Sequence, residues 1–130
     1  NGVSVSPGGD ELAFLAFTHN PSHGSSFSFL RLPATAFAAL VFNDTGMAHH
    51  QKKEWAKAAE LFTRAVYADP TKELFAYNLA CALAQKGDAT AEHALKHAIA
   101  LGGDAVKKRA AKDTDFASAK DAPWFKDAVR

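Results

Sequence analysis

Two histidines, His93 and His97, stand four residues apart in the segment AEHALKHAIA, which is predicted to be helical. This spacing places two imidazoles on one helix face, where together they can bind a metal ion. A third ligand is not evident from the sequence, although His49, His50 or an acidic side chain could approach. We therefore expect two surface histidines, and we predict neither a metal site nor a cofactor.

Other chemistry-bearing residues in the sequence also fit ordinary surface roles. Acidic residues, Asp104 and Asp113, flank a small basic patch, so a solvated helix face is expected rather than a phosphate site. The patch consists of Lys107, Lys108, Arg109 and Lys112. The sequence has no glycine-rich phosphate loop, no nucleophile elbow and no HExxH zinc motif. We predict that the protein is not an enzyme.

The composition is that of a single globular domain. The chain has 130 residues, of which 48% are hydrophobic, so it can bury a core. Its 15 basic and 14 acidic side chains nearly cancel, which gives no general attraction to nucleic acid. No apolar run reaches the roughly 18 residues that a transmembrane helix needs. Asn1 fits a fragment, or a product of processing such as removal of an export signal; otherwise the protein would be cytoplasmic.

The single cysteine, Cys81, excludes an internal disulfide. It lies among apolar residues of a predicted helix. We expect a buried small hydrophobe there rather than a reactive thiol.

Residues 1–32 form a segment that is predicted to be β-structure. The runs LAFLAFT, from Leu12, and FSFLRL, from Phe27, indicate two strands of a hairpin, and residues 3–6 could add a third strand. A lone hairpin is barely stable, so it must pack on the rest of the chain or pair with another copy. Its exposed edge would then use apolar side chains for self-association, namely Leu12, Phe14, Phe17, Phe27 and Phe29.

Residues 33–130 are predicted to be helical and to contain an internal repeat. One helix is expected over 34–52, and a second helix carries Trp55, Ala58, Phe62 and Ala65 on one face before Pro70. The pattern then recurs with a period of about 34 residues, so that Ala80 corresponds to Gly46 of the first helix. In the second helix the period is 33 residues, and Ala91, Leu95 and Ala98 correspond to Ala58, Phe62 and Ala65. Thr71 is predicted to cap the third helix, Gly87-Asp88 to make the turn after it, and Gly102-Gly103 to end the fourth helix.

This period, with small residues at these places, resembles the tetratricopeptide repeat (TPR). NLACALAQKGD, AIALGG and DFASAKDAPWF together resemble the closing unit of bacterial TPR arrays. The resemblance covers about residues 42–129 and implies a mainly α fold of two helix–turn–helix repeats plus C-terminal capping helices. It further implies that Phe116, Trp124 and Phe125 cover the second repeat.

TPR proteins mostly bind other proteins, on a concave surface lined by the first helix of each repeat. The resemblance therefore implies a partner protein or peptide, of mixed polarity, on a neutral surface that lacks the basic residues of a carboxylate clamp. The implied surface comprises Leu40, Asn43, Met47, His50, Gln51, Tyr77, Asn78, Cys81, Ala84 and Gln85. The protein's own N-terminal segment could instead fill this groove.

The alternative function is that of a structural subunit that forms a homo-oligomer or filament. Two repeats fall below the roughly three that a stable stack needs. The β segment or the repeat ends of another copy could complete the core, and a head-to-tail contact can grow into a filament.

Overall fold

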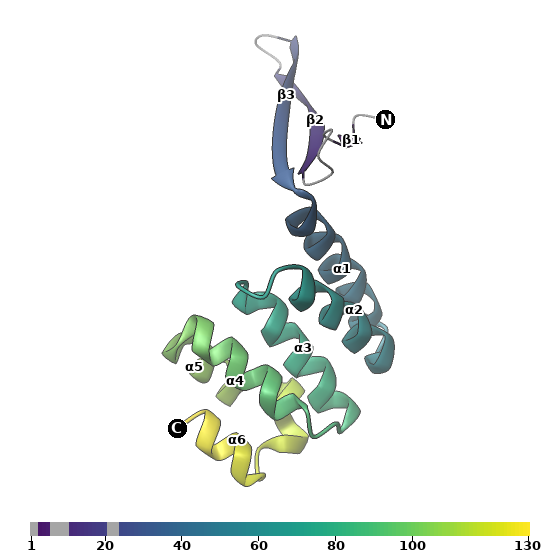
Figure 1. Ribbon diagram of the computed structural model, residues 1–130. Helices are drawn as coiled ribbons and strands as arrows, with labels where there is room; N and C mark the ends of the chain where they lie inside the picture. The colour runs from purple at the N-terminus through teal and green to yellow at the C-terminus, as the bar shows by residue number, and fades with distance from the viewer. Residues whose placement is uncertain (1–2, 6–10, 21–23) are drawn as a thin grey trace. The chain divides into compact units, whose positions relative to one another are not determined.

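The computed structural model describes the backbone of residues 3–5, 11–20 and 24–130 and the side chains of residues 35–130 (Figure 1). The part whose side chains are described is mainly helical, which confirms the predicted fold class at that level. The chain divides into two compact units, Asn1–Ala38 and Ala39–Arg130. In the described residues no helix combines the length and the apolar character that crossing a membrane requires.

Three antiparallel strands make up most of the first unit: β1 (Val3–Val5), β2 (Glu11–Asn20) and β3 (Gly24–Pro33). They pair in the order β1-β2-β3, with Val3 opposite Phe14 and Glu11 opposite Pro33. Five apolar side chains of this unit are predicted to drive self-association, and they lie outside the part of the chain whose side chains are described. They belong to Leu12, Phe14, Phe17, Phe27 and Phe29.

The helices follow the predicted order closely. Helix α1 (Ala34–Gln51) is one residue shorter than expected, and helix α2 (Trp55–Ala68) ends before Pro70. The remaining helical elements are α3 (Glu73–Lys86), α4 (Ala91–Gly102), α5 (Asp104–Lys112), the 3-10 helix η1 (Thr114–Ala119) and α6 (Pro123–Ala128). Gly87 and Gly103 adopt positive φ angles of 78° and 64° beyond the ends of α3 and α4, a conformation that glycine adopts without steric cost.

Two helical hairpins, α1–α2 and α3–α4, bury the repeated positions. Phe62 of α2 and Leu95 of α4 occupy equivalent positions of the two repeats, and both are fully buried. The small residues around them are buried as well, and they let neighbouring helices approach closely. These residues are Ala58, Ala65, Ala91 and Ala98. The fold is therefore helical-repeat-like.

Similar turns precede the two helices of the second hairpin, α3 and α4. Asp69 Oδ1 accepts hydrogen bonds from the backbone N–H and the hydroxyl of Thr71, and Asp88 Oδ1 does the same with Thr90. These bonds lower the pKa of both carboxyl groups, the threonine hydroxyl being the largest cause. The predicted helix cap at Thr71 is wrong, because α3 begins at Glu73 and Lys72 occupies the cap position without a side-chain bond.

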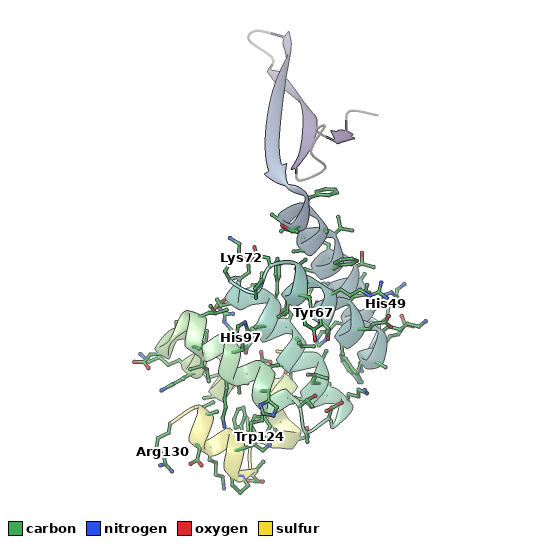
Figure 2. All side chains as sticks on the ribbon, viewed as in Figure 1. His49, Tyr67, Lys72, His97, Trp124 and Arg130 are labelled. Carbon is green, nitrogen blue, oxygen red and sulfur yellow. The ribbon has the colours of Figure 1, made fainter. Side chains whose placement is uncertain are left out.

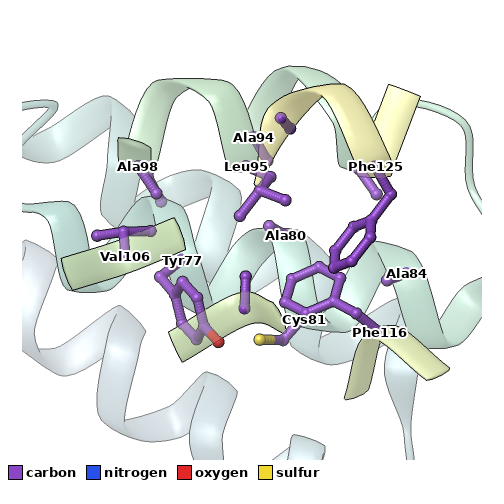
Figure 3. Packing of buried hydrophobic residues seen from close by; sticks show 14 residues of the cluster. Tyr77, Ala80, Cys81, Ala84, Ala94, Leu95, Ala98, Val106, Phe116 and Phe125 are labelled. Atoms are coloured by element: carbon purple, nitrogen blue, oxygen red, sulfur yellow. The ribbon is translucent and has the colours of Figure 1, made fainter. Parts of the chain in front are cut away.

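The C-terminal elements complete the core beside α3 and α4. Phe116 of η1 is fully buried, and Phe125 of α6 packs on it with ring centroids 5.3 Å apart (Figure 3). Both belong to the cluster that contains Tyr77, Leu95 and the fully buried Val106 of α5. Trp124 is partly buried against the same cluster, so all three aromatic residues cover the second repeat, with Phe116 deepest.

Gly46 marks the closest approach of α1 to α2. A Cβ at this position would lie 2.7 Å from Cε1 of Phe62 and 3.3 Å from Cβ of Leu61. We expect Gly46→Ala to destabilise the fold, because overpacking costs about 1–3 kcal/mol and the better helix propensity of alanine returns only about 0.5–1 kcal/mol. Urea unfolding measures this difference. In a Phe62→Leu background the penalty of Gly46→Ala should shrink; an equal penalty in both backgrounds would show that the ring contact is not its cause.

Phe116 and Trp124 allow a graded test of the C-terminal cap. Phe116→Ala should cost about 3–5 kcal/mol because the ring is fully buried in the main core. Trp124→Ala should cost less, since its side chain is only partly buried. Thermal and urea unfolding of both variants give the order, and a smaller loss for Phe116→Ala would contradict this placement of the cap.

Candidate functional site

The first helices of the two hairpins meet through a pair of amides. Asn78 Nδ2 of α3 donates to Asn43 Oδ1 of α1 at 2.9 Å. Asn43 is buried and Asn78 is half-buried. Among the described residues, neither Asn43 Nδ2 nor Asn78 Oδ1 has a hydrogen-bond partner, and neither is a buried unpaired atom. One donor and one acceptor are therefore left for solvent or a ligand.

The inner face of α3 is covered by residues 113–119, which we call the strap. The hydroxyl of Tyr77 donates to Asp113 Oδ2 at 2.7 Å, and Gln85 Nε2 donates to Asp115 Oδ1 at 2.8 Å. The hydroxyl of Ser118 donates to the backbone carbonyl of Ala84 at 3.4 Å. The C-terminal part of the chain thus fills the α3 half of the predicted groove, whereas the sequence had offered the N-terminal segment for this place.

A pocket of about 150 Å³ remains between α1, α2, α3 and the strap. Its lining residues are Met47, His50, Phe62, Tyr77, Asn78, Cys81, Asp113 and Asp115. Five of the predicted surface residues therefore come together at one pocket, and Asn43 joins them through its bond to Asn78. Ala84 and Gln85 are covered by the strap, while Leu40 and Gln51 are exposed on α1.

Leu40 has a counterpart that the sequence prediction missed. Leu74 occupies the same position of the next repeat, and both leucines are 47% exposed. Leu40 lies three residues before Asn43, and Leu74 lies three residues before Tyr77, so each leucine shares a helix face with that residue. The open part of the surface thus combines two apolar side chains with the amide pair.

Asp113, Asp115 and Cys81 form the one group among the described residues with the geometry of a metal site, because their ligand atoms lie within 4.8 Å of one another. Metal binding needs the thiolate form of cysteine. Burial, and then the nearby carboxylates of Asp113 and Asp115, raise the pKa of the Cys81 thiol well above its ordinary value. The thiol is therefore protonated at neutral pH in the fold without a metal ion.

The carboxylates of this group already take part in a hydrogen-bond network. Asp115 Oδ2 is 3.0 Å from His50 Nε2, and Asp113 Oδ1 accepts from the backbone N–H of Asp115 at 2.9 Å. Burial, together with the bond to Asp113, raises the pKa of the Tyr77 hydroxyl. His50 Nδ1 is buried and has no hydrogen-bond partner among the described residues. The network links α1, α3 and the strap through one polar cluster.

His93 and His97 lie on α4 at a different surface (Figure 2 labels His97). Both line a groove of about 420 Å³ with Val66, Leu79 and Leu83. His93 is exposed as expected, but His97 is half-buried and its Nε2 lies 2.9 Å from the carbonyl oxygen of Pro70. The two histidines do not join a group of three potential metal ligands among the described residues.

Sequence reasoning missed the two strap aspartates at the pocket. Asp113 appeared only as a flank of the basic patch, and Asp115 carried no prediction. The available signal was local: Asp113, Thr114 and Asp115 precede the apolar Phe116, which had been assigned to the cap. A capping segment that buries Phe116 on α3 brings the acidic residues before it to the inner face.

No protein-family model matches the chain, and no curated protein or solved structure is significantly similar to it.

The raised pKa of Cys81 predicts a loss of stability in mild alkali. Its thiol ionises near pH 8.5 in the unfolded chain but stays protonated in the fold, so the unfolded state binds fewer protons above that pH. The free energy of unfolding should fall between pH 8 and 9.5 by up to about 1.4 kcal/mol per pH unit. Urea unfolding over this range measures the slope.

Cys81→Ala and Cys81→Ser are the matched variants, because neither residue ionises in this range and serine retains a donor near Asp113. Both should flatten the slope, whatever they do to stability at pH 7. A slope unchanged in both variants would contradict the assignment to Cys81.

Proposed function

We propose that the chain is a TPR-like binding module that holds a segment of a partner protein on the surface formed by α1 and α3. The observation that carries the proposal is the Asn43–Asn78 pair, which leaves the amide N–H donors of Asn43 and the carbonyl acceptor of Asn78 for a ligand. An extended peptide presents the same two groups along its backbone, and both of its groups need partners when they leave water.

The surroundings of the amide pair support a peptide rather than a small metabolite. Leu40 and Leu74 are exposed at the same position of their repeats, so they can accept apolar side chains of an extended segment. The neighbouring pocket of about 150 Å³ is smaller than the roughly 300–1,000 Å³ of typical small-molecule sites. It has room for one side chain of a peptide lying across the surface.

The repeat architecture gives further support. The burial of equivalent residues in the two hairpins, such as Phe62 and Leu95, agrees with two stacked TPR-like units. The cap formed by Phe116 and Phe125 agrees with the closing unit that the sequence resembles. TPR-like hairpins are suited to protein binding because adjacent first helices form a continuous recognition surface.

Selection of short random peptides displayed on phage, with the whole chain as bait, tests the proposal. We expect selected peptides to bind in solution and to lose about three- to tenfold in affinity with Asn78→Ala, the value of one net hydrogen bond. His93→Ala, on the exposed side of α4, is the control and should bind as the wild type does. Unfolding curves check that Asn78→Ala remains folded.

Two results would contradict the proposal: no peptide binding above background, or selected peptides that are indifferent to Asn78→Ala, Leu40→Ala and Leu74→Ala. Light scattering on the same samples separates binding from self-association. A mass that stays near 13.9 kDa at all concentrations fits a monomeric binding module, whereas a mass that rises would favour the structural subunit.

A further inference from the structure

The pocket beside the amide pair is sized for a single side chain. A cavity of about 150 Å³ can hold a group about as large as benzene. Its walls include the rings of His50, Phe62 and Tyr77, with the His50 and Phe62 ring centroids 6.2 Å apart. Arg109 already lies over the Tyr77 ring, with its Cζ 4.9 Å from the ring centroid. A flat, polarisable group would therefore have the rings of His50 and Phe62 to contact.

The polar part of the pocket carries an excess of negative charge. Asp113 and Asp115 both line it, and among the described residues neither has a lysine or arginine within ion-pair distance. The imidazole of His50 is the one basic group in the described part of the chain that pairs with either carboxylate, so two acidic groups face one histidine. Tyr77 and Gln85 supply neutral donors.

Both carboxylates can accept further hydrogen bonds. Each carboxylate oxygen has two lone-pair sites. Asp113 Oδ2 accepts from Tyr77 and from the thiol of Cys81, whereas each of the other three oxygens accepts one bond, from Gln85, His50 or the Asp115 N–H. In the neutral tautomer whose Nε2–H donates to Asp115, His50 Nδ1 is an additional acceptor, and it is buried without a partner among the described residues. Unpaired buried acceptors cost free energy, so a ligand rich in N–H donors that reached this group would remove that cost.

We propose that this pocket receives the arginine side chain of a peptide bound across α1 and α3. The guanidinium is planar, carries five N–H donors and stacks on aromatic rings, which matches a pocket with two carboxylates and the rings of His50 and Phe62. Lysine offers one compact, strongly hydrated charge and makes less use of the rings. The proposal rests on the proposed function, because the peptide surface presents the side chain to the pocket.

The test uses N-acetyl-arginine N-methylamide as the probe, titrated into the whole ¹⁵N-labelled chain and followed by NMR. The expected result is saturable shifts at backbone amides of pocket residues such as Asn78 and Asp115. The citrulline analogue is the matched neutral probe and should shift these amides little. The lysine analogue should bind several-fold more weakly than the arginine analogue.

Asp113→Asn and Asp115→Asn test the two carboxylates separately. Each variant keeps one acceptor oxygen, which preserves the bonding of one of the two carboxylate oxygens. Each should weaken the arginine probe about tenfold, as expected for a lost charge-assisted bond. Asp127→Asn is the control, because it removes the same charge from a carboxyl whose side chain is 68% exposed on α6. Unfolding curves confirm that both pocket variants fold.

Several outcomes would overturn the proposal: equal binding of the citrulline or lysine probe, shifts spread over exposed acidic residues, or equal weakening by Asp127→Asn. Peptides that need Asn78 but bind equally well with arginine replaced by citrulline would overturn the arginine assignment while leaving the proposed function standing. Saturable binding of the arginine probe without any peptide binding would support the pocket and overturn the proposed function.

Discussion

The structure depends on the burial of α3 from several sides at once. Phe75 is buried in one cluster with Ala65, whereas Tyr77 and Cys81 are buried in another with Leu95. Four alanines of α3 are buried as well. A helix with apolar residues all round must be enclosed, and alanine lets the enclosing elements come close. Helix α2 and helix α4 cover two sides, and the strap covers a third. Each of these elements packs mainly against α3.

Enclosure by the strap also determines the character of the site. The two repeats alone would present a neutral surface of amides, sulfur and aromatic rings. The strap adds the carboxylates of Asp113 and Asp115, so the charge of the pocket comes from the capping segment and not from the repeats. Because Phe116 is fully buried next to these residues, displacing the strap would expose the core.

Local patterns in the sequence were sufficient to predict the helices. The recurrence of Ala58, Phe62 and Ala65 as Ala91, Leu95 and Ala98 fixed the faces of α2 and α4, since a helical period is a property of neighbouring residues. The surface that holds Met47, His50 and Asn78 was predicted from the resemblance to TPR units. Thr71 is not the cap because α3 begins one residue later than such a cap requires.

The other half of the site depended on contacts between distant residues. Tyr77 and Asp113 are 36 residues apart, and Gln85 and Asp115 are 30 apart. No periodicity links such pairs; their meeting follows from the way Phe116 packs on α3. What the apolar residues of the N-terminal strands pack against is likewise not a local property of the sequence, and their side chains lie outside the described part of the chain.

The cap on α4 gives this domain a direction. In a helical-repeat stack a further repeat would pack against the last hairpin, but the cluster around Leu95 already includes Phe125 and Ala128 of α6. A gene duplication that lengthened the stack would therefore be tolerated only if the new repeat were inserted ahead of the last hairpin, α3–α4. Longer stacks that arose in this way would gain repeats only on the N-terminal side of the last hairpin, and all of them would keep the same C-terminal cap.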